Sequence, residues 1–253
     1  VLKPDLKWSI ETKNVQQLMA LNVLLDPAIQ LVTLLGPAGT GKTFITLVAA
    51  LYEVLVKEEY DKILVSRPVI PLGRDIGFLP GEVHEKLHSW MQPIYDNMEY
   101  IVHLANTTLA RGAGIYREEV PEERYDKKSK YKNRKLQREK VLPPLDELIK
   151  RGKISLEAIT YMRGRSIPYQ YIFIDEVQNL TPHEVKTLIS RVGEGSKIVL
   201  AGDPYQIDSP YLDFASNGLV VASQKFKGQK IFGTVFLETS ERSELSRLAG
   251  TLL

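Results

Sequence analysis

The sequence predicts an α/β protein in which a mostly parallel sheet carries helices on both faces. Short apolar runs alternate along the chain with longer segments of helical periodicity. Such alternation is typical of strands joined by helical crossovers, which favour a parallel sheet. The chain has 253 residues, of which 43% are hydrophobic and 25% are charged, a balance typical of a globular protein. We therefore expect a single domain over residues 1–253, with a core that needs no disulfides.

The amino-terminal third predicts a helix, a strand and a second helix. Apolar residues recur at helical spacing over 14–25, behind Asn14 as a candidate cap, and Asp26-Pro27 ends the helix. An apolar run at 30–35 predicts the first strand. After a glycine-rich turn, the amphipathic stretch 42–57 predicts the second helix.

The remaining elements follow the same alternation. Thr181 can cap a helix in which Pro182 takes the first position and Glu184 closes a capping box. A closing helix is expected over 240–252. The other strands are expected at four apolar runs, which are 62–67, 169–175, 197–200 and 231–237.

Composition excludes several classes of protein. The chain has no cysteine, which excludes disulfide scaffolds, thiolate metal clusters and cysteine nucleophiles. No apolar run approaches the roughly 18–20 residues that span a bilayer, and the amino terminus lacks the apolar stretch of a secretory signal. We expect a cytoplasmic protein that does not associate with membranes. The first residue is Val1 rather than methionine, which suggests a piece of a longer chain.

A charged insertion is expected at about 101–140. Residues 117–140 contain ten basic and six acidic residues, so this stretch carries more than the formal net charge of +2 and the rest of the chain is slightly acidic. It has too few apolar residues to fold by burial. It is either a solvated loop or an arm that binds a phosphate backbone, with Tyr125 and Tyr131 available to stack on bases.

The turn after the first strand has the pattern GxxxxGK[ST] of a phosphate-binding loop. Its glycines let backbone N–H groups point at phosphate oxygens, and the following helix offers its positive end. Lys42 is expected to reach the β and γ phosphates of ATP, and Thr43 to bind Mg²⁺. The alternative is a glycine turn without a ligand. The loop consists of Gly36, Pro37, Ala38, Gly39, Thr40, Gly41, Lys42 and Thr43.

Two acidic residues follow the strand at 169–175. The carboxyl end of a strand is where open α/β sheets bind ligands. Asp175 is expected to hold the Mg²⁺, directly or through water, and Glu176 to orient and deprotonate the attacking water. Alone, such a pair is explained equally well by a helix cap or a solvated turn, but beside a phosphate-binding loop it indicates nucleotide hydrolysis.

Further motifs give a family resemblance. The pairing of DEVQ (175–178) with GDPYQ (202–206) resembles superfamily 1 helicases. With AGTGKT and the segments 65–82, 160–168 and 238–249, the chain resembles the PhoH family of phosphate-starvation ATPases over nearly its whole length, except about 101–140. It is most similar to the ATPase half of longer members, in which a PIN ribonuclease domain precedes this module. A stand-alone relative is the alternative.

The resemblance implies a RecA-like P-loop fold and an RNA helicase or translocase that uses ATP and Mg²⁺. It implies an adenine contact for Gln17 and a γ-phosphate sensor at Gln206. It also implies a sensor or finger role for Arg242. The alternatives are an exposed helix face for Gln17, a turn hydrogen bond for Gln206 and a surface charge for Arg242. Four other arginines compete for the finger role, namely Arg67, Arg74, Arg163 and Arg165.

The same resemblance implies a homohexameric ring acting on single-stranded RNA. Superfamily 1 motors clamp ATP between two domains, whereas this chain has room for one core. Each site would therefore be completed by a neighbouring subunit, and a PIN ribonuclease domain would lie outside this chain.

Two other function classes compete. His84-Glu85-Lys86-Leu87-His88 has the HExxH spacing of a zinc metallopeptidase. The extended form of that motif needs Gly and His where the chain has Met91 and Ile94, and Pro93 is expected to cut the helix short, so we interpret the motif as a polar helix face. The second class is an ATP-driven protein remodeller, against which the DEVQ and GDPYQ motifs favour nucleic acid.

Overall fold

The computed structural model describes residues 3–6, 8, 10–68, 83–112, 142–162 and 164–241, with the backbone alone for 83–89 and 110–112. Six parallel strands form one sheet in the order β3-β2-β4-β5-β1-β6. The parallel sheet predicted from the sequence is therefore confirmed. The strands are β1 (Leu31–Leu35), β2 (Lys62–Ser66), β3 (Ile154–Leu156), β4 (Gln170–Ile174), β5 (Lys197–Gly202) and β6 (Phe232–Phe236).

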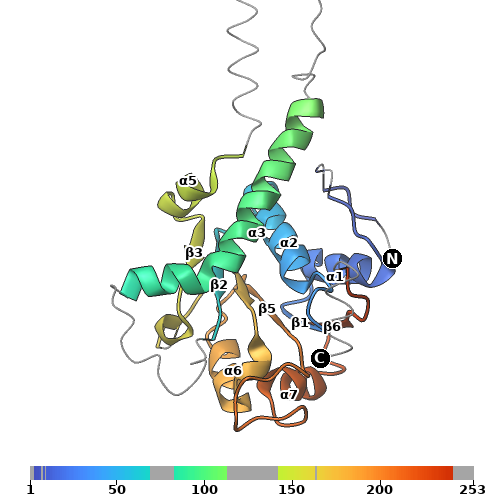
Figure 1. Ribbon diagram of the computed structural model, residues 1–253, viewed down its shortest axis with the longest axis vertical. Helices are drawn as coiled ribbons and strands as arrows, with labels where there is room; N and C mark the ends of the chain where they lie inside the picture. Colours follow the sequence, from blue (N-terminus) through green and yellow to red (C-terminus); the bar gives the residue numbers. More distant parts are fainter. Residues whose placement is uncertain are drawn as a thin grey trace, which may run out of the picture.

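Helices cover both faces of this sheet, as Figure 1 shows. The first face carries α1 (Val15–Leu25), α2 (Lys42–Leu55), α3 (Val83–Gly112) and α5 (Leu145–Lys150). The second face carries α6 (Pro182–Ile189) and α7 (Gly218–Lys225), with the short 3₁₀ turns η1 (Ile159–Met162) and η2 (Val177–Asn179) nearby. Layers of helix, sheet and helix are the arrangement that an alternating α/β sequence favours.

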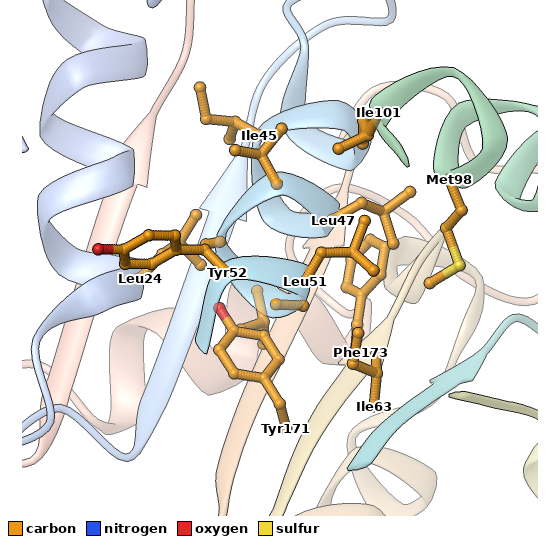
Figure 2. Packing of buried hydrophobic residues seen from close by; sticks show 14 of the residues in the cluster. Leu24, Ile45, Leu47, Leu51, Tyr52, Ile63, Met98, Ile101, Tyr171 and Phe173 are labelled. Carbon is orange, nitrogen blue, oxygen red and sulfur yellow. The ribbon is translucent and has the colours of Figure 1, made fainter. Parts of the chain in front are cut away.

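The two faces of the sheet have separate cores because successive side chains of a strand point to opposite sides. In β4, Tyr171 and Phe173 belong to the core under α1, α2 and α3, whereas Ile172 and Ile174 belong to the core under α6 and α7. Figure 2 shows the first core, in which Leu51 and other side chains of α2 lie among side chains from the neighbouring elements, namely Leu24 of α1, Met98 of α3, Ile63 of β2 and Phe173 of β4.

Helix capping follows the sequence prediction. The side chain of Asn14 accepts a hydrogen bond from the backbone N–H of Gln17 at the start of α1. Thr181 and Glu184 form the predicted capping box at α6, with Pro182 in the first helical turn. These local bonds satisfy amides that a helix start leaves without intrahelical partners, so they fix both starts.

The helix α3 corrects one expectation. Pro93 was expected to end the helix, but it lies inside α3, which continues to Gly112. Ile94, Met98 and Ile101 are almost completely buried. A proline within a helix costs about 3 kcal/mol, whereas each buried side chain of this size contributes about 1.5–3 kcal/mol, so burial outweighs the cost. Figure 1 shows α3 as bent, the usual effect of an internal proline.

The expected insertion at 101–140 is part of this packing at its start. Residues 101–112 belong to α3, and Ile101, Val102 and Ala105 are buried in the core. The side-chain amide of Asn106 exchanges two hydrogen bonds, of 2.7 and 3.0 Å, with the backbone of Leu142. Residues 113–141, including the basic stretch, lie outside the described residues, as does the closing helix expected at 240–252 apart from its first two positions.

Among the helices that the structure describes, none is both long and apolar enough to cross a membrane.

Candidate functional site

The turn between β1 and α2 has three glycines with positive φ, Gly36, Gly39 and Gly41, of which the first and last show most clearly why glycine is needed. Gly36 has φ of +149°, and a Cβ there would lie 2.0 Å from the backbone oxygen of Leu237. Gly41 has φ of +88°, the left-handed conformation that glycine adopts without strain, and precedes the first residue of α2. The turn therefore wraps closely against the chain after β6 and presents the amino terminus of α2 to the cavity beside it.

Lys42 lies across this turn. Its ammonium group donates hydrogen bonds to the backbone oxygens of Gly36, at 2.6 Å, and Pro37, at 2.8 Å. The lysine is 8% exposed, and it lines a cavity of about 310 Å³ at the carboxyl edge of the sheet. A phosphate entering this cavity would offer the ammonium group charged acceptors, which bind it more strongly than carbonyl oxygens do.

Thr43 and Asp175 meet at the same cavity. The hydroxyl of Thr43 donates to a carboxylate oxygen of Asp175 at 3.0 Å, although the two residues are 132 positions apart in sequence. Burial, then the neighbouring charge of Glu176, raises the pKa of Asp175 to about 6, while the Thr43 hydrogen bond opposes this shift. Hydroxyl and carboxylate oxygens are ligands that Mg²⁺ prefers, so this pair fits the magnesium site predicted from the sequence.

Glu176 is held at both carboxylate oxygens. One oxygen accepts from the guanidinium of Arg67 at 3.0 Å, and the other accepts from the side-chain amide of Gln178 at 2.6 Å. The backbone of Glu176 has φ of 55°, a left-handed conformation that a residue with a side chain rarely adopts. Such strain is concentrated at functional sites, and Glu176 lines the cavity.

Gln178 is a functional candidate that the sequence analysis did not single out. It is 1% exposed, and its side chain contacts two separate segments of the site. The amide nitrogen donates to Glu176 and to the backbone oxygen of Gln206 at 2.9 Å, while the amide oxygen accepts from the backbone N–H of Asp203 at 3.2 Å. The buried amide thus connects the acidic pair after β4 with the segment after β5.

Asp203 connects that second segment with the phosphate-binding turn. One carboxylate oxygen accepts from the backbone N–H of Ala38 at 3.0 Å, and the other accepts from the backbone N–H of Tyr205 at 3.0 Å. The sequence signal for this residue was its place in GDPYQ, but the link to Ala38 depends on the tertiary fold. The exposed side chain of Gln206 also lines the cavity, as its expected sensor role requires.

Gln17 is buried, which excludes the exposed helix face considered above. Its amide nitrogen donates to the backbone oxygen of Thr40 at 3.1 Å, and its amide oxygen accepts from the backbone N–H of Lys13 at 2.9 Å. The residue therefore supports the phosphate-binding turn in this structure. An adenine contact would require the amide to exchange these partners.

The arginines predicted as fingers are placed differently. Arg67 contacts Glu176 and also lies 5.6 Å from the ring centre of Trp90 on α3. Arg165 is paired with Glu157. The other candidates, Arg74, Arg163 and Arg242, lie outside the described residues. Among the described candidates, Arg67 is therefore the arginine with a direct contact to the acidic pair.

Two residues of the cavity wall were not expected. Phe44 follows Thr43 in the first turn of α2, and Asn97 comes from α3, far from any of the motifs. No cluster of three His, Cys, Asp or Glu side chains that could hold a metal ion occurs in the described part of the chain. For the HExxH motif, the backbone at 84–88 is helical, but the side chains of His84, Glu85 and His88 lie outside the described residues.

The raised pKa of Asp175 predicts a pH-dependent affinity for Mg²⁺. Below about pH 6 a proton occupies this carboxyl and competes with the cation, so the Mg²⁺ affinity of the protein with bound nucleotide should fall by up to about tenfold per pH unit. Titration of the protein with Mn²⁺ or Mg²⁺ at several pH values between 5 and 8 measures this change in affinity.

The matched control for this titration is Asp175→Asn. The nucleotide's own phosphates also bind protons in this range, and the variant retains that contribution while it removes the carboxyl. We expect the Asn variant to bind the cation more weakly and with a shallower pH dependence. Equal pH dependence in the two proteins would contradict a role for Asp175 in holding the cation.

The chain is similar in sequence to a protein family and to curated bacterial proteins. The family model described as "PhoH-like protein" matches residues 9–249. The chain is 49% identical over 247 residues to Protein PhoH2 of Bacillus subtilis, covering 97% of this chain and 48% of the relative. It is 32% identical over 194 residues to the PhoH-like protein of the same organism, covering 77% of this chain and 48% of the relative. The chain thus spans about half the length of these curated relatives.

Among solved structures, the Pif1 helicase of Candida albicans aligns with 96% of this chain and 43% of its own, at 16% identity and a TM-score of 0.40. A Bacteroides Pif1 structure in complex with ADP-AlF4 aligns with 95% of this chain and 45% of its own, at 15% identity and a TM-score of 0.37.

Proposed function

Because the chain belongs to the family of PhoH-like proteins, we propose that it hydrolyses ATP with Mg²⁺ and couples hydrolysis to single-stranded RNA, as a helicase or translocase module. The observation that carries the hydrolytic part is the 3.0 Å contact between Thr43 and Asp175, with Lys42 and Glu176 around the same cavity. A glycine turn without a ligand gives no reason for a buried carboxylate to meet the hydroxyl of this turn.

In this proposal the residues of the turn bind the triphosphate. Backbone N–H groups of the turn and the ammonium group of Lys42 neutralise the phosphate oxygens, on which negative charge develops during phosphoryl transfer. Thr43 and Asp175 would hold the Mg²⁺, which contributes positive charge next to the phosphates when it is bound. Gln17 is proposed to contact adenine.

Glu176 is proposed as the general base. Its carboxylate lies beside the cavity, where a water molecule between it and the terminal phosphate would give up a proton to it. Gln178 and Arg67 fix the orientation of this carboxylate through its two oxygens. Gln206, whose backbone is bonded to Gln178, is proposed to contact the γ phosphate.

The coupling to RNA rests on the pairing of the DEVQ and GDPYQ motifs. The side chain of Gln178 bonds both segments, so a shift of Glu176 during hydrolysis is transmitted to Asp203 and Gln206. The described residues contain one six-stranded sheet, with the cavity at its carboxyl edge. We therefore propose that a second copy completes the site in a homohexameric ring and supplies the finger arginine, for which Arg242 is a candidate. A PIN ribonuclease domain outside this chain is a further part of the proposal.

The proposal is tested by ATP hydrolysis measured with a panel of polymers. Single-stranded RNA should raise the rate of the purified protein by several-fold, whereas single-stranded DNA and an unfolded protein should not. Stimulation by unfolded protein instead would favour the remodeller, and an equal response to DNA would remove the preference for RNA. Absence of hydrolysis under every condition, together with absence of ATP binding, would contradict the whole proposal.

The same assay, repeated over a dilution series with light scattering to report the assembly state, tests the ring. Specific activity should fall as the assembly dissociates. A constant specific activity through the dissociation range would show that one subunit carries a complete site.

A further inference from the structure

Three aromatic side chains are exposed on the segment 203–217, which follows β5 at the carboxyl edge of the sheet. Tyr205 is 71% exposed, Tyr211 is 91% exposed and Phe214 is 45% exposed. An isolated exposed aromatic residue is ordinary, but several on one short segment are characteristic of a binding surface. The same segment carries Asp203 and Gln206, so these rings lie close in sequence to the nucleotide site.

Two of the rings are stacked on each other. The ring centres of Tyr205 and Phe214 are 5.0 Å apart, and the ring planes are inclined by 27°. Stacking uses one face of each ring, and the exposure of both residues means that much of the remaining surface is open to solvent. Exposed aromatic surface of this kind can take a further planar group in an offset stack.

The segment is held in place by hydrogen bonds rather than by burial of these rings. The carboxylate of Asp213 accepts from the backbone N–H groups of Ala215 and Ser216, at 2.9 and 2.7 Å. The backbone N–H of Asp208 donates to the side chain of Asn179 at 2.8 Å, and Asn217 caps α7. The rings are therefore presented on a preorganised segment, which lowers the entropy lost when a ligand binds.

Asp203 connects this segment to the phosphate-binding turn. Its two carboxylate oxygens accept separately from the N–H of Ala38, in the turn, and from the N–H of Tyr205, at the stack. A phosphate bound in the turn would compete with Asp203 for the N–H of Ala38. Movement of that carboxylate would change its bond to the backbone N–H of Tyr205 and so connect nucleotide binding to the position of the ring.

We propose that the Tyr205–Phe214 stack, together with Tyr211, is a platform on which bases of a single-stranded nucleic acid stack, and that Asp203 couples this platform to the bound nucleotide. The proposal rests on the proposed function and deepens it. The segment 203–217 contains three aspartates and no lysine or arginine, so it does not attract a phosphate backbone. Its contribution is base stacking, which depends little on sequence because every base has an aromatic face.

The test compares binding of two fluorescein-labelled strands of about 12 nucleotides, a single-stranded RNA and a strand of the same length without bases. Wild type should bind the RNA more tightly than the abasic strand. Tyr205→Leu and Phe214→Leu should each lose RNA affinity by about 5- to 100-fold with little change for the abasic strand, because Leu keeps apolar bulk but not the aromatic face. Tyr205→Phe should retain the preference.

Tyr169→Leu is the matched control. Tyr169 is a 49% exposed tyrosine at the opposite edge of the sheet, directly before β4, and its replacement should leave RNA affinity unchanged. Phe214→Leu should also keep the ATP hydrolysis rate measured without RNA. A non-hydrolysable ATP analogue should shift the RNA affinity of wild type, and Asp203→Ala should remove this shift.

The outcomes separate the platform from the proposed function. If wild type binds RNA and the Leu variants bind it equally well, the platform is wrong while the RNA coupling stands. If wild type binds no strand, the RNA coupling fails and the platform with it. Leu variants that change the oligomeric state while their RNA affinity stays at the wild-type level would assign the rings to a subunit interface and overturn the platform.

Discussion

Glu176→Gln should leave ATP binding intact and lower the rate of hydrolysis by about 10²–10⁴-fold, the usual contribution of a general base. Glutamine keeps the shape of the side chain and can still accept a hydrogen bond from Arg67 or Gln178 through its single oxygen. It cannot take a proton from water near neutral pH. Binding of a fluorescent ATP analogue and steady-state phosphate release measure the two properties separately.

Glu194→Gln is the matched control for this prediction. Glu194 is an exposed glutamate in the turn before β5, at the opposite edge of the sheet from the cavity. Its replacement should change neither binding nor turnover. If Glu176→Gln turned over ATP at the rate of wild type, another group would have to act as the base.

Replacement of Gln178 should change the rate of ATP hydrolysis through its effect on the orientation of the Glu176 carboxylate. Removing an amide that bonds Glu176, Gln206 and Asp203 frees the carboxylate of Glu176 to adopt other orientations, because Arg67 then remains its one side-chain hydrogen-bond partner among the described residues. The amide therefore acts by positioning. Because this amide is buried and bonded at several atoms, its removal should cost more free energy than the loss of a single hydrogen bond.

The sequence predicts most of the sheet because five of its strands are apolar runs bounded by turns. β3 was missed because it has three residues and one of them, Ser155, is polar. The helix α7 was missed because its apolar residues are clustered rather than spaced along one helical face. For α3, the rule that proline ends a helix predicted an end at Pro93, which is wrong. The helix continues because burial of its later side chains against residues distant in sequence stabilises it.

In the candidate site too, some features could be predicted from local sequence and others depend on the tertiary fold. The phosphate-binding turn and the acidic pair were predictable because a motif records local backbone requirements, such as the positive φ at Gly41, and because parallel strands bring their carboxyl ends to one edge. The bond of Asp203 to Ala38 was not predictable, since nothing in the sequence spacing specifies which backbone group a carboxylate meets. Asn97 reaches the cavity through the packing of α3 against the sheet, whereas Phe44 lies there because it follows Thr43 in the first turn of α2.

Lys42→Ala should weaken ATP binding by at least about tenfold and lower hydrolysis by about 10²–10³-fold, the effect of removing one donor that stabilises transition-state charge. The ammonium group lies within the turn, so its loss removes the positive charge closest to where the phosphates are proposed to bind. The shift in melting temperature caused by ATP should be lost with the affinity, because that shift reports binding to the folded state.

A second buried lysine separates this effect from a general loss of stability. Lys197 in β5 donates to the backbone oxygens of Leu24 and Asp26 at the end of α1, at 2.7 and 2.8 Å, and burial lowers its pKa to about 8. Lys197→Ala leaves these oxygens without their donor and should destabilise the fold by about 1–3 kcal/mol. It should nevertheless keep its ATP affinity, whereas Lys42→Ala should keep a folded protein that does not bind ATP. The contrary outcome is that both variants lose ATP affinity in proportion to the fall in their melting temperatures. In that case the effect of Lys42 would come from the stability of the fold, and the proposal that Lys42 contacts the phosphates would be wrong.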